Sequence, residues 1–100
     1  PAPPVAEPTL VTRKAKPDPA KMLESSRQAL ASGDISVAVE LYGGLIKRKE
    51  TLGQVIEDLR IALERTPDVA ALWQVLGDAY MKNDRTSEAI EAYRKGMEAS

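Results

Sequence analysis

The sequence contains no cysteine, no histidine and no phenylalanine among its 100 residues. Without cysteine it cannot form disulfides, thiolate nucleophiles or cysteine-ligated metal sites, although the redox compartment stays undecided. Without histidine it lacks the usual general base and the commonest metal ligand. No apolar run approaches the roughly 20 residues that a membrane-spanning helix needs. We therefore expect no catalytic residue, no metal, no cofactor and no membrane partner.

The sequence also has no large excess of charge of either sign, because its formal net charge is −1 and acidic and basic residues are interspersed. The basic cluster at residues 47–49 stands at the expected end of a helix, where cations interact favourably with the helix dipole. Aromatic residues do not interleave it, so nucleic-acid binding is not indicated. Carboxylate pairs such as Glu57 with Asp58 follow the pattern of a solvated helix face, which argues against an enzyme.

Six of the seven prolines stand in residues 1–19. Proline fixes φ and donates no amide hydrogen, so we expect an extended Pro-rich tail at residues 1–18 and a helical domain at residues 19–100. Because the sequence does not begin with methionine, we also expect it to be a fragment of a longer chain.

Capping signals predict five helices that end near residues 32, 49, 65, 82 and 97. Gly33 can adopt the left-handed conformation that stops the first helix. Thr51 and Gln54 form a T-x-x-Q capping box at the start of the third. Aromatic residues are few, so the core must come from aliphatic side chains packed helix on helix. The residues expected to cap or start the helices are Asp18, Asp34, Thr51, Asp68, and Asp84 or Thr86.

Helix pairs recur about every 34 residues, which is a signature of a helical solenoid. In this alignment each large apolar residue matches an apolar one, and Gly77 matches Gly43, which suggests that both glycines serve the same packing role. The aligned pairs are Trp73 with Val39, Leu76 with Tyr42, Gly77 with Gly43, Tyr80 with Ile46, Ala89 with Val55, Tyr93 with Leu59, and Gly96 with Ala62.

The strongest pattern lies in the last two helices and follows W-x2-L-G-x2-Y, then A-x3-aromatic. It consists of Trp73, Leu76, Gly77, Tyr80, Ala89 and Tyr93, and Pro67 stands where a preceding repeat would end. In these residues the chain resembles the tetratricopeptide repeat (TPR) family, over residues 67–96 in motif and 20–99 in architecture. The resemblance implies an all-α, right-handed superhelical solenoid, here of about five helices.

The glycine and the aromatic residues of the stretch 73–80 share one helix face at spacings of three and four. Gly77 lacks a Cβ and so lets the partner helix approach, with Ala89 as the matching small surface, while Trp73 and Tyr80 fill the space on either side. A ligand box built on Trp73 and Tyr80 is the alternative. The repeat spacing already accounts for both rings, so packing is the favoured interpretation.

A second alignment competes with the 34-residue one. Ala38 and Tyr42 stand 51 residues before Ala89 and Tyr93, and 51 residues are one and a half repeats. In this frame residues 19–50 form a first repeat. We expect five stacked helices in which the second helix serves both neighbours.

In TPR proteins the first helix of each pair lines a concave groove, and by resemblance the second and fourth helices do so here. Members that grip a C-terminal carboxylate use Lys and Asn where this chain has Gln74 and Asp78, so that clamp is not expected. The mixture of apolar and charged side chains suits a peptide or a helix as ligand. The predicted partner-binding residues are Leu41, Lys47, Arg48, Ala71, Gln74, Val75, Asp78, Met81 and Lys82.

The resemblance implies a non-catalytic interaction scaffold that binds a protein or peptide segment. The alternative is a structural or regulatory appendage, or a self-association module, of a larger protein with no ligand groove of its own. Ile90, Tyr93 and Met97 have no sixth helix to cover them, so the terminal helix could pair with another copy of the chain.

Overall fold

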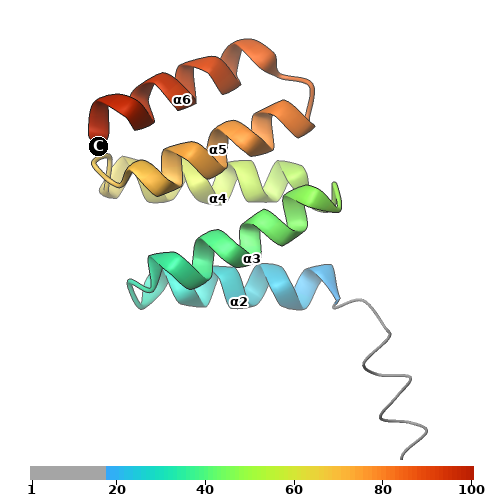
Figure 1. Cartoon of the computed structure of the whole chain (residues 1–100). Helices are drawn as coiled ribbons and strands as arrows, with labels where there is room; N and C mark the ends of the chain where they lie inside the picture. The colour runs from blue at the N-terminus through green and yellow to red at the C-terminus, as the bar shows by residue number, and fades with distance from the viewer. Residues whose placement is uncertain (1–17) are drawn as a thin grey trace, which may run out of the picture.

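The computed structural model describes residues 18–100, which form five α-helices joined by short turns (Figure 1). The described part contains no strand, so the predicted all-α helical array is confirmed. Residues 1–17 of the tail predicted at residues 1–18 lie outside the described residues. The helices are α2 (Pro19–Ala31), α3 (Ile35–Lys47), α4 (Leu52–Arg65), α5 (Ala70–Lys82) and α6 (Thr86–Ala99).

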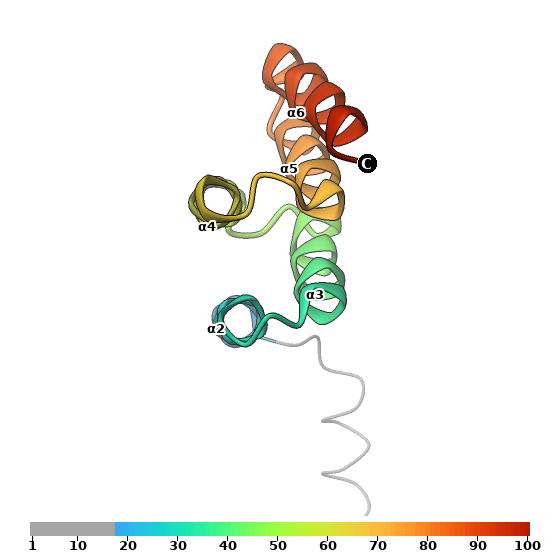
Figure 2. The same ribbon diagram turned by 90° about the vertical axis from the view of Figure 1, so that its left-hand side faces the viewer.

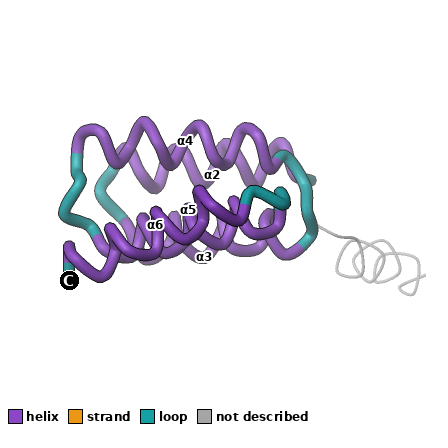
Figure 3. Tube along the Cα trace, turned by 90° about the horizontal axis from the view of Figure 1, so that it is seen from above, coloured by secondary structure: helices purple, strands orange, loops and turns teal. Residues whose placement is uncertain are grey.

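The five helices lie side by side in two rows of unequal length. Seen along the helix axes, α2 and α4 form one row, and α3, α5 and α6 form the other (Figure 2). The view from above shows the same division, with all five axes roughly aligned (Figure 3). Helices α2, α4 and α6 run in one direction, while α3 and α5 run in the opposite direction. The row containing α4 therefore ends one helix short of the row containing α6.

The start of α2 follows the sequence prediction in full, whereas α3, α4 and α6 begin at the predicted residues but without the predicted side-chain caps. The Asp18 carboxylate accepts a hydrogen bond from the Ala20 amide at 3.0 Å, and Pro19 occupies the first turn. The predicted capping box at Thr51 is wrong, because this residue is left-handed (φ 52°) and its hydroxyl donates to the Glu50 carbonyl at 2.6 Å. Asp68 does not cap α5, since the N-cap position is Val69. Asp34 and Arg85 occupy N-cap positions without a side-chain cap.

Three helices end at a residue with positive φ, but only one of these residues is glycine. Gly33 has φ 79°, as predicted, whereas Lys49 has φ 56° and Asp84 has φ 60°. The backbone N–H of the residue after each of them donates a hydrogen bond to a carbonyl of the preceding helix, for example from Glu50 to Leu45 at 3.0 Å. The turn after α3 thus forms its hydrogen bonds only because Lys49 adopts the left-handed conformation. This conformation is strained for a residue that has a Cβ.

Replacing Lys49 with glycine is expected to raise the free energy of unfolding by about 0.5–1 kcal/mol, because glycine adopts positive φ without steric cost. The matched control is Lys47→Gly, two residues earlier and inside α3, which should lower stability by about 1 kcal/mol. Urea denaturation followed by circular dichroism measures both. If both variants lost stability equally, the left-handed conformation of Lys49 would be refuted.

The packing of α3 decides between the two repeat alignments. Helix α3 packs extensively against α2 and α5 but makes few contacts with α4, so its hairpin partner is α2. The hairpins α2–α3 and α5–α6 are offset by 51 residues. Their first helices begin at residues 19 and 70, and their second helices begin at residues 35 and 86. The 51-residue frame therefore describes the structure, and α4 stands between the two hairpins as an additional helix.

This frame corrects the role predicted for Gly43. A Cβ built on Gly43 meets nothing within 4 Å, so this glycine is not the packing equivalent of Gly77. In the 51-residue frame the equivalent of Gly77 is Ser26, which is fully buried and donates its hydroxyl to the Met22 carbonyl at 2.7 Å. Gly44 has a packing role instead, since a Cβ there would lie 3.1 Å from the Met22 methyl group.

Gly77 marks a close approach between α5 and α6. A Cβ at this position would lie 2.5, 2.7 and 2.8 Å from Cε1, Cδ1 and Cζ of Tyr93. The predicted close contact is confirmed, but the ring of Tyr93 meets it rather than the methyl group of Ala89. Gly96 provides a second approach, because a Cβ there would lie 3.1 Å from Cβ of Trp73. Two glycines, one on each helix, thus allow this hairpin to close.

Trp73 is half-buried and packs against the core at the start of α5. Its indole N–H donates to the Pro67 carbonyl at 2.7 Å, which ties the α4–α5 turn to the hairpin. The Lys95 ammonium lies 5.2 Å from the centre of the indole ring, within the range of a cation–π interaction. The indole N–H of Trp73 and one face of its ring are therefore engaged by the chain itself, in agreement with a packing role.

Candidate functional site

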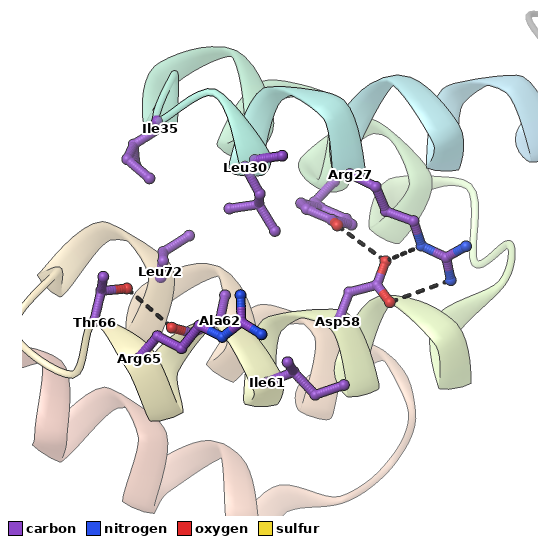
Figure 4. A pocket seen from close by; sticks show the side chains of 12 residues that line it. Arg27, Leu30, Ile35, Asp58, Ile61, Ala62, Arg65, Thr66 and Leu72 are labelled. Carbon is purple, nitrogen blue, oxygen red and sulfur yellow. Dashed lines mark hydrogen bonds and ion pairs between the residues drawn. The ribbon is translucent and has the colours of Figure 1, made fainter.

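A groove of about 360 Å³ lies between the C-terminal halves of α2 and α4 (Figure 4). It exists because these two helices run parallel in the same row but touch only sparsely. Leu72 from α5 and Tyr42 from α3 reach it from the other row. The lining residues are Arg27, Leu30, Ala31, Gly33, Ile35, Tyr42, Asp58, Ile61, Ala62, Arg65, Thr66 and Leu72.

A polar network joins three helices at one end of the groove (Figure 4). The Asp58 carboxylate accepts from Nε of Arg27 at 2.7 Å and from Nη2 of Arg27 at 3.2 Å. It also accepts from the hydroxyl of Tyr42 at 3.0 Å. Tyr42 is fully buried, and the Asp58 side chain is 13% exposed. Both carboxylate oxygens are therefore engaged, and α4 is held to the first hairpin through this carboxylate.

The second hairpin has a simpler version of the same contact. The hydroxyl of Tyr93 donates to the Asp78 carboxylate within the hairpin. In the 51-residue frame Tyr93 corresponds to Tyr42, and Asp78 corresponds to Arg27. Where the second hairpin has its own carboxylate, the first has a guanidinium that holds the carboxylate of α4.

Burial raises the pKa of the Tyr42 hydroxyl above its ordinary value, and the Asp58 carboxylate raises it further. Burial, with the Asp78 carboxylate adding to it, also raises the pKa of Tyr93 to about 12. The folded chain thus holds these protons more tightly than the unfolded chain does. The stability they contribute is present below pH about 10, where the unfolded tyrosines ionise, and it is lost as the pH rises further.

The variant Tyr42→Phe is expected to flatten this alkaline loss, because phenylalanine has no proton to lose. Urea unfolding at several pH values between about 8 and about 11.5 should show a shallower fall in stability for the variant than for the unchanged chain. Equal slopes would contradict a raised pKa at Tyr42.

The rest of the groove is mostly apolar. Leu30, Ile35 and Leu72 form its walls, and Ile61 is 46% exposed although it is a large aliphatic residue. Thr66 donates its hydroxyl to the Ala62 carbonyl of its own helix at 2.9 Å. Arg65 lies along α4 with its guanidinium between Thr66 and Asp58 (Figure 4). The arrangement offers apolar surface for a side chain from outside, with a cation beside it.

The partner-binding residues predicted from the sequence lie elsewhere, on α3 and α5. Of the six predicted on α5, only Val75 is buried, with 6% exposure. Arg48 turns inward, with a guanidinium nitrogen 3.1 Å from the sulfur of Met22 and another 2.9 Å from the Glu50 carboxylate. The exposed members are Lys47, Ala71, Gln74, Asp78, Met81 and Lys82, and Leu41 is half-buried. None of the nine lines the groove between α2 and α4.

Sequence reasoning missed the groove because it took the binding residues from the 34-residue frame, in which α3 and α4 form one helix pair, whereas α3 makes few contacts with α4. Ile61 could have indicated the groove, because it is a large aliphatic residue on α4 that does not belong to the buried face of that helix. The buried face consists of Val55, Ile56, Leu59 and Leu63.

A second hollow of about 220 Å³ lies where α4, α5 and α6 meet. Trp73, Leu76 and Tyr80 contribute apolar surface, while Arg60 and Glu91 are among the charged residues around it. Within residues 18–100 no group of acidic side chains could hold a metal ion, and no helix is long and apolar enough to cross a membrane.

Two curated proteins are similar in sequence to this chain. The peroxisomal targeting signal receptor of Kluyveromyces lactis is 36% identical over 69 residues, which are 69% of this chain. The peroxisomal targeting signal receptor of Candida albicans is 31% identical over 74 residues, which are 74% of this chain. No protein-family model matches the sequence, and no solved structure matches it significantly. The chain spans 12% of the length of each of these two receptors.

Proposed function

We propose that residues 19–100 form a non-catalytic protein-interaction domain of the tetratricopeptide-repeat type, which binds a segment of a partner protein in the groove between α2 and α4. The observation that carries this proposal is an apolar groove of about 360 Å³ in which Ile61 remains 46% exposed. Ligand pockets usually have volumes of about 300–1,000 Å³, so this groove lies at the small end of that range.

The similarity to proteins named as targeting signal receptors supports a binding role at a coarse level. The composition supports it too, because the sequence has neither histidine nor cysteine to carry common hydrolytic or metal chemistry. Burying an apolar side chain in the groove would supply about 25 cal/mol per Å² of apolar surface removed from water.

The groove predicted from the sequence on α3 and α5 stays a second candidate surface for the same function. Its exposed cations are Lys47 and Lys82, at the C-terminal ends of the two helices. The double variant Lys47→Glu with Lys82→Glu would weaken partner binding if this surface carries it, and would leave binding unchanged if the α2–α4 groove carries it.

Selection of a random displayed peptide library on the whole immobilised chain tests the proposal. Peptides enriched on the chain should lose affinity at least about tenfold with Ile61→Asp, a change of about 1.4 kcal/mol. The matched control is Ile90→Asp, which introduces the same charge at a 62% exposed isoleucine on α6. Fluorescence polarisation with labelled peptides measures the affinities, and circular dichroism confirms that both variants fold. No enrichment, or equal binding by both variants, would contradict the proposed groove.

Self-association remains the second candidate function, and one observation favours it. Ile90 is 62% exposed and Met97 is 73% exposed on the same helix, seven residues apart. Residues at this spacing share a helix face and could pair with a second copy. Light scattering after size-exclusion chromatography at low and high concentration would detect a dimer, and a strict monomer at both concentrations would remove this candidate.

A further inference from the structure

Among the arginines of residues 18–100, one forms no ion pair with the chain itself, and it lies at the groove. Six arginines fall within residues 18–100, and five of them form ion pairs with a carboxylate of the chain itself. Arg65 forms none within the described part of the chain. The pairs are Arg27 with Asp58, Arg48 with Glu50, Arg60 with Glu57, Arg85 with Glu88, and Arg94 with Glu91 and Glu98.

The helical neighbours of Arg65 explain the exception. Arg60 and Arg94 find a glutamate three residues before them on the same helix, at the spacing that brings side chains together. The corresponding positions before Arg65 are Ala62 and Ile61, and both line the groove. At the helical positions where Arg60 and Arg94 have a glutamate, Arg65 therefore has only apolar residues that line the groove.

The remaining charges of the groove do not neutralise Arg65. Its lining contains two cations, Arg27 and Arg65, and one anion, Asp58. Both oxygens of Asp58 are already engaged by Arg27 and by the hydroxyl of Tyr42. The uncompensated charge of the lining is thus positive and belongs to Arg65. A planar guanidinium binds a carboxylate through two parallel hydrogen bonds, so an acidic group is the matching ligand.

We infer that the groove selects partner segments in which a large apolar side chain stands next to a glutamate or an aspartate. This inference rests on the proposed function and specifies the chemistry of the partner. The apolar side chain enters between Leu30, Ile35 and Ile61, and the acidic side chain pairs with the guanidinium of Arg65. Binding covers the apolar surface around this pair, so the ion pair is less screened by water than an ordinary surface pair.

Two synthetic peptides test the inference, both based on the sequence most enriched in the library selection. They differ only at the acidic position, which carries glutamate in one and lysine in the other. The unchanged chain should bind the glutamate peptide about ten- to thirtyfold more tightly, and Arg65→Glu should reverse this preference. The matched control is Arg60→Glu on the same helix, which lies outside the groove and should keep the preference for glutamate.

The outcomes separate the inference from the function on which it rests. Enriched peptides without an acidic residue, or a preference that Arg65→Glu leaves unchanged, would overturn the inference, while a loss of binding with Ile61→Asp would still support the groove. If no peptide binds in a manner that depends on Ile61, the proposed groove and the inference fail together. A preference for glutamate that weakens at high salt and reverses with Arg65→Glu supports both.

Discussion

Replacing Gly77 with alanine is expected to lower the free energy of unfolding, because forcing an extra methyl group into a packed contact usually costs about 1–3 kcal/mol. The added Cβ would lie 2.5–2.8 Å from three ring atoms of Tyr93. The ring cannot move away freely, because its hydroxyl is bonded to Asp78. Alanine returns up to about 1 kcal/mol in a helix interior, so the net loss should be up to about 2 kcal/mol.

Gly43→Ala is the matched control for this experiment and should change stability in the opposite direction. Gly43 is also inside a helix, but a Cβ there meets nothing within 4 Å. Alanine should therefore stabilise the chain by up to about 1 kcal/mol. Thermal or urea denaturation of both variants gives the comparison, and the loss at Gly77 should shrink when Tyr93 is replaced by leucine. Equal effects at the two glycines would show that the α5–α6 contact is not as close as described.

Removing the carboxylate of Asp58 is expected to cost about 2–3 kcal/mol, because it leaves the buried hydroxyl of Tyr42 without its acceptor. The Arg27 pair adds less than its short distance suggests, since the Arg27 side chain is 47% exposed and screened by water. Asp58→Ala should therefore loosen α4 from the first hairpin as well as lower the overall stability.

Two further variants isolate the contributions within this network. Tyr42→Phe removes both the donor and its need for an acceptor, so the loss should be only about 1 kcal/mol. Glu57→Ala, at the neighbouring exposed position on α4, should change stability by less than about 0.5 kcal/mol. Urea denaturation measures all three, and hydrogen exchange should show faster exchange in α4 for Asp58→Ala. If Asp58→Ala were no more destabilising than Glu57→Ala, the network would not hold α4 in place.

The candidate site could be predicted from the sequence only in part. The all-α class, the five helices and the close contact at Gly77 follow from periodicity and local composition. The groove does not, because α3 was compatible with two partners by pattern alone. A 34-residue alignment paired it with α4 and matched Gly43 to Gly77, and only spatial contact shows that its partner is α2.

By itself, the sequence determined the helical class and where the first helix begins and ends. Asp18 followed by Pro19 starts a helix and Gly33 ends one, because capping and left-handed turns require only local chemistry. The tertiary structure alone decided which helices pair, which arginine of residues 18–100 lacks a carboxylate partner, and where apolar surface stays open. These features depend on residues distant in sequence, such as Arg27 and Asp58. Their contact arises only after α2 and α4 have packed into the same row.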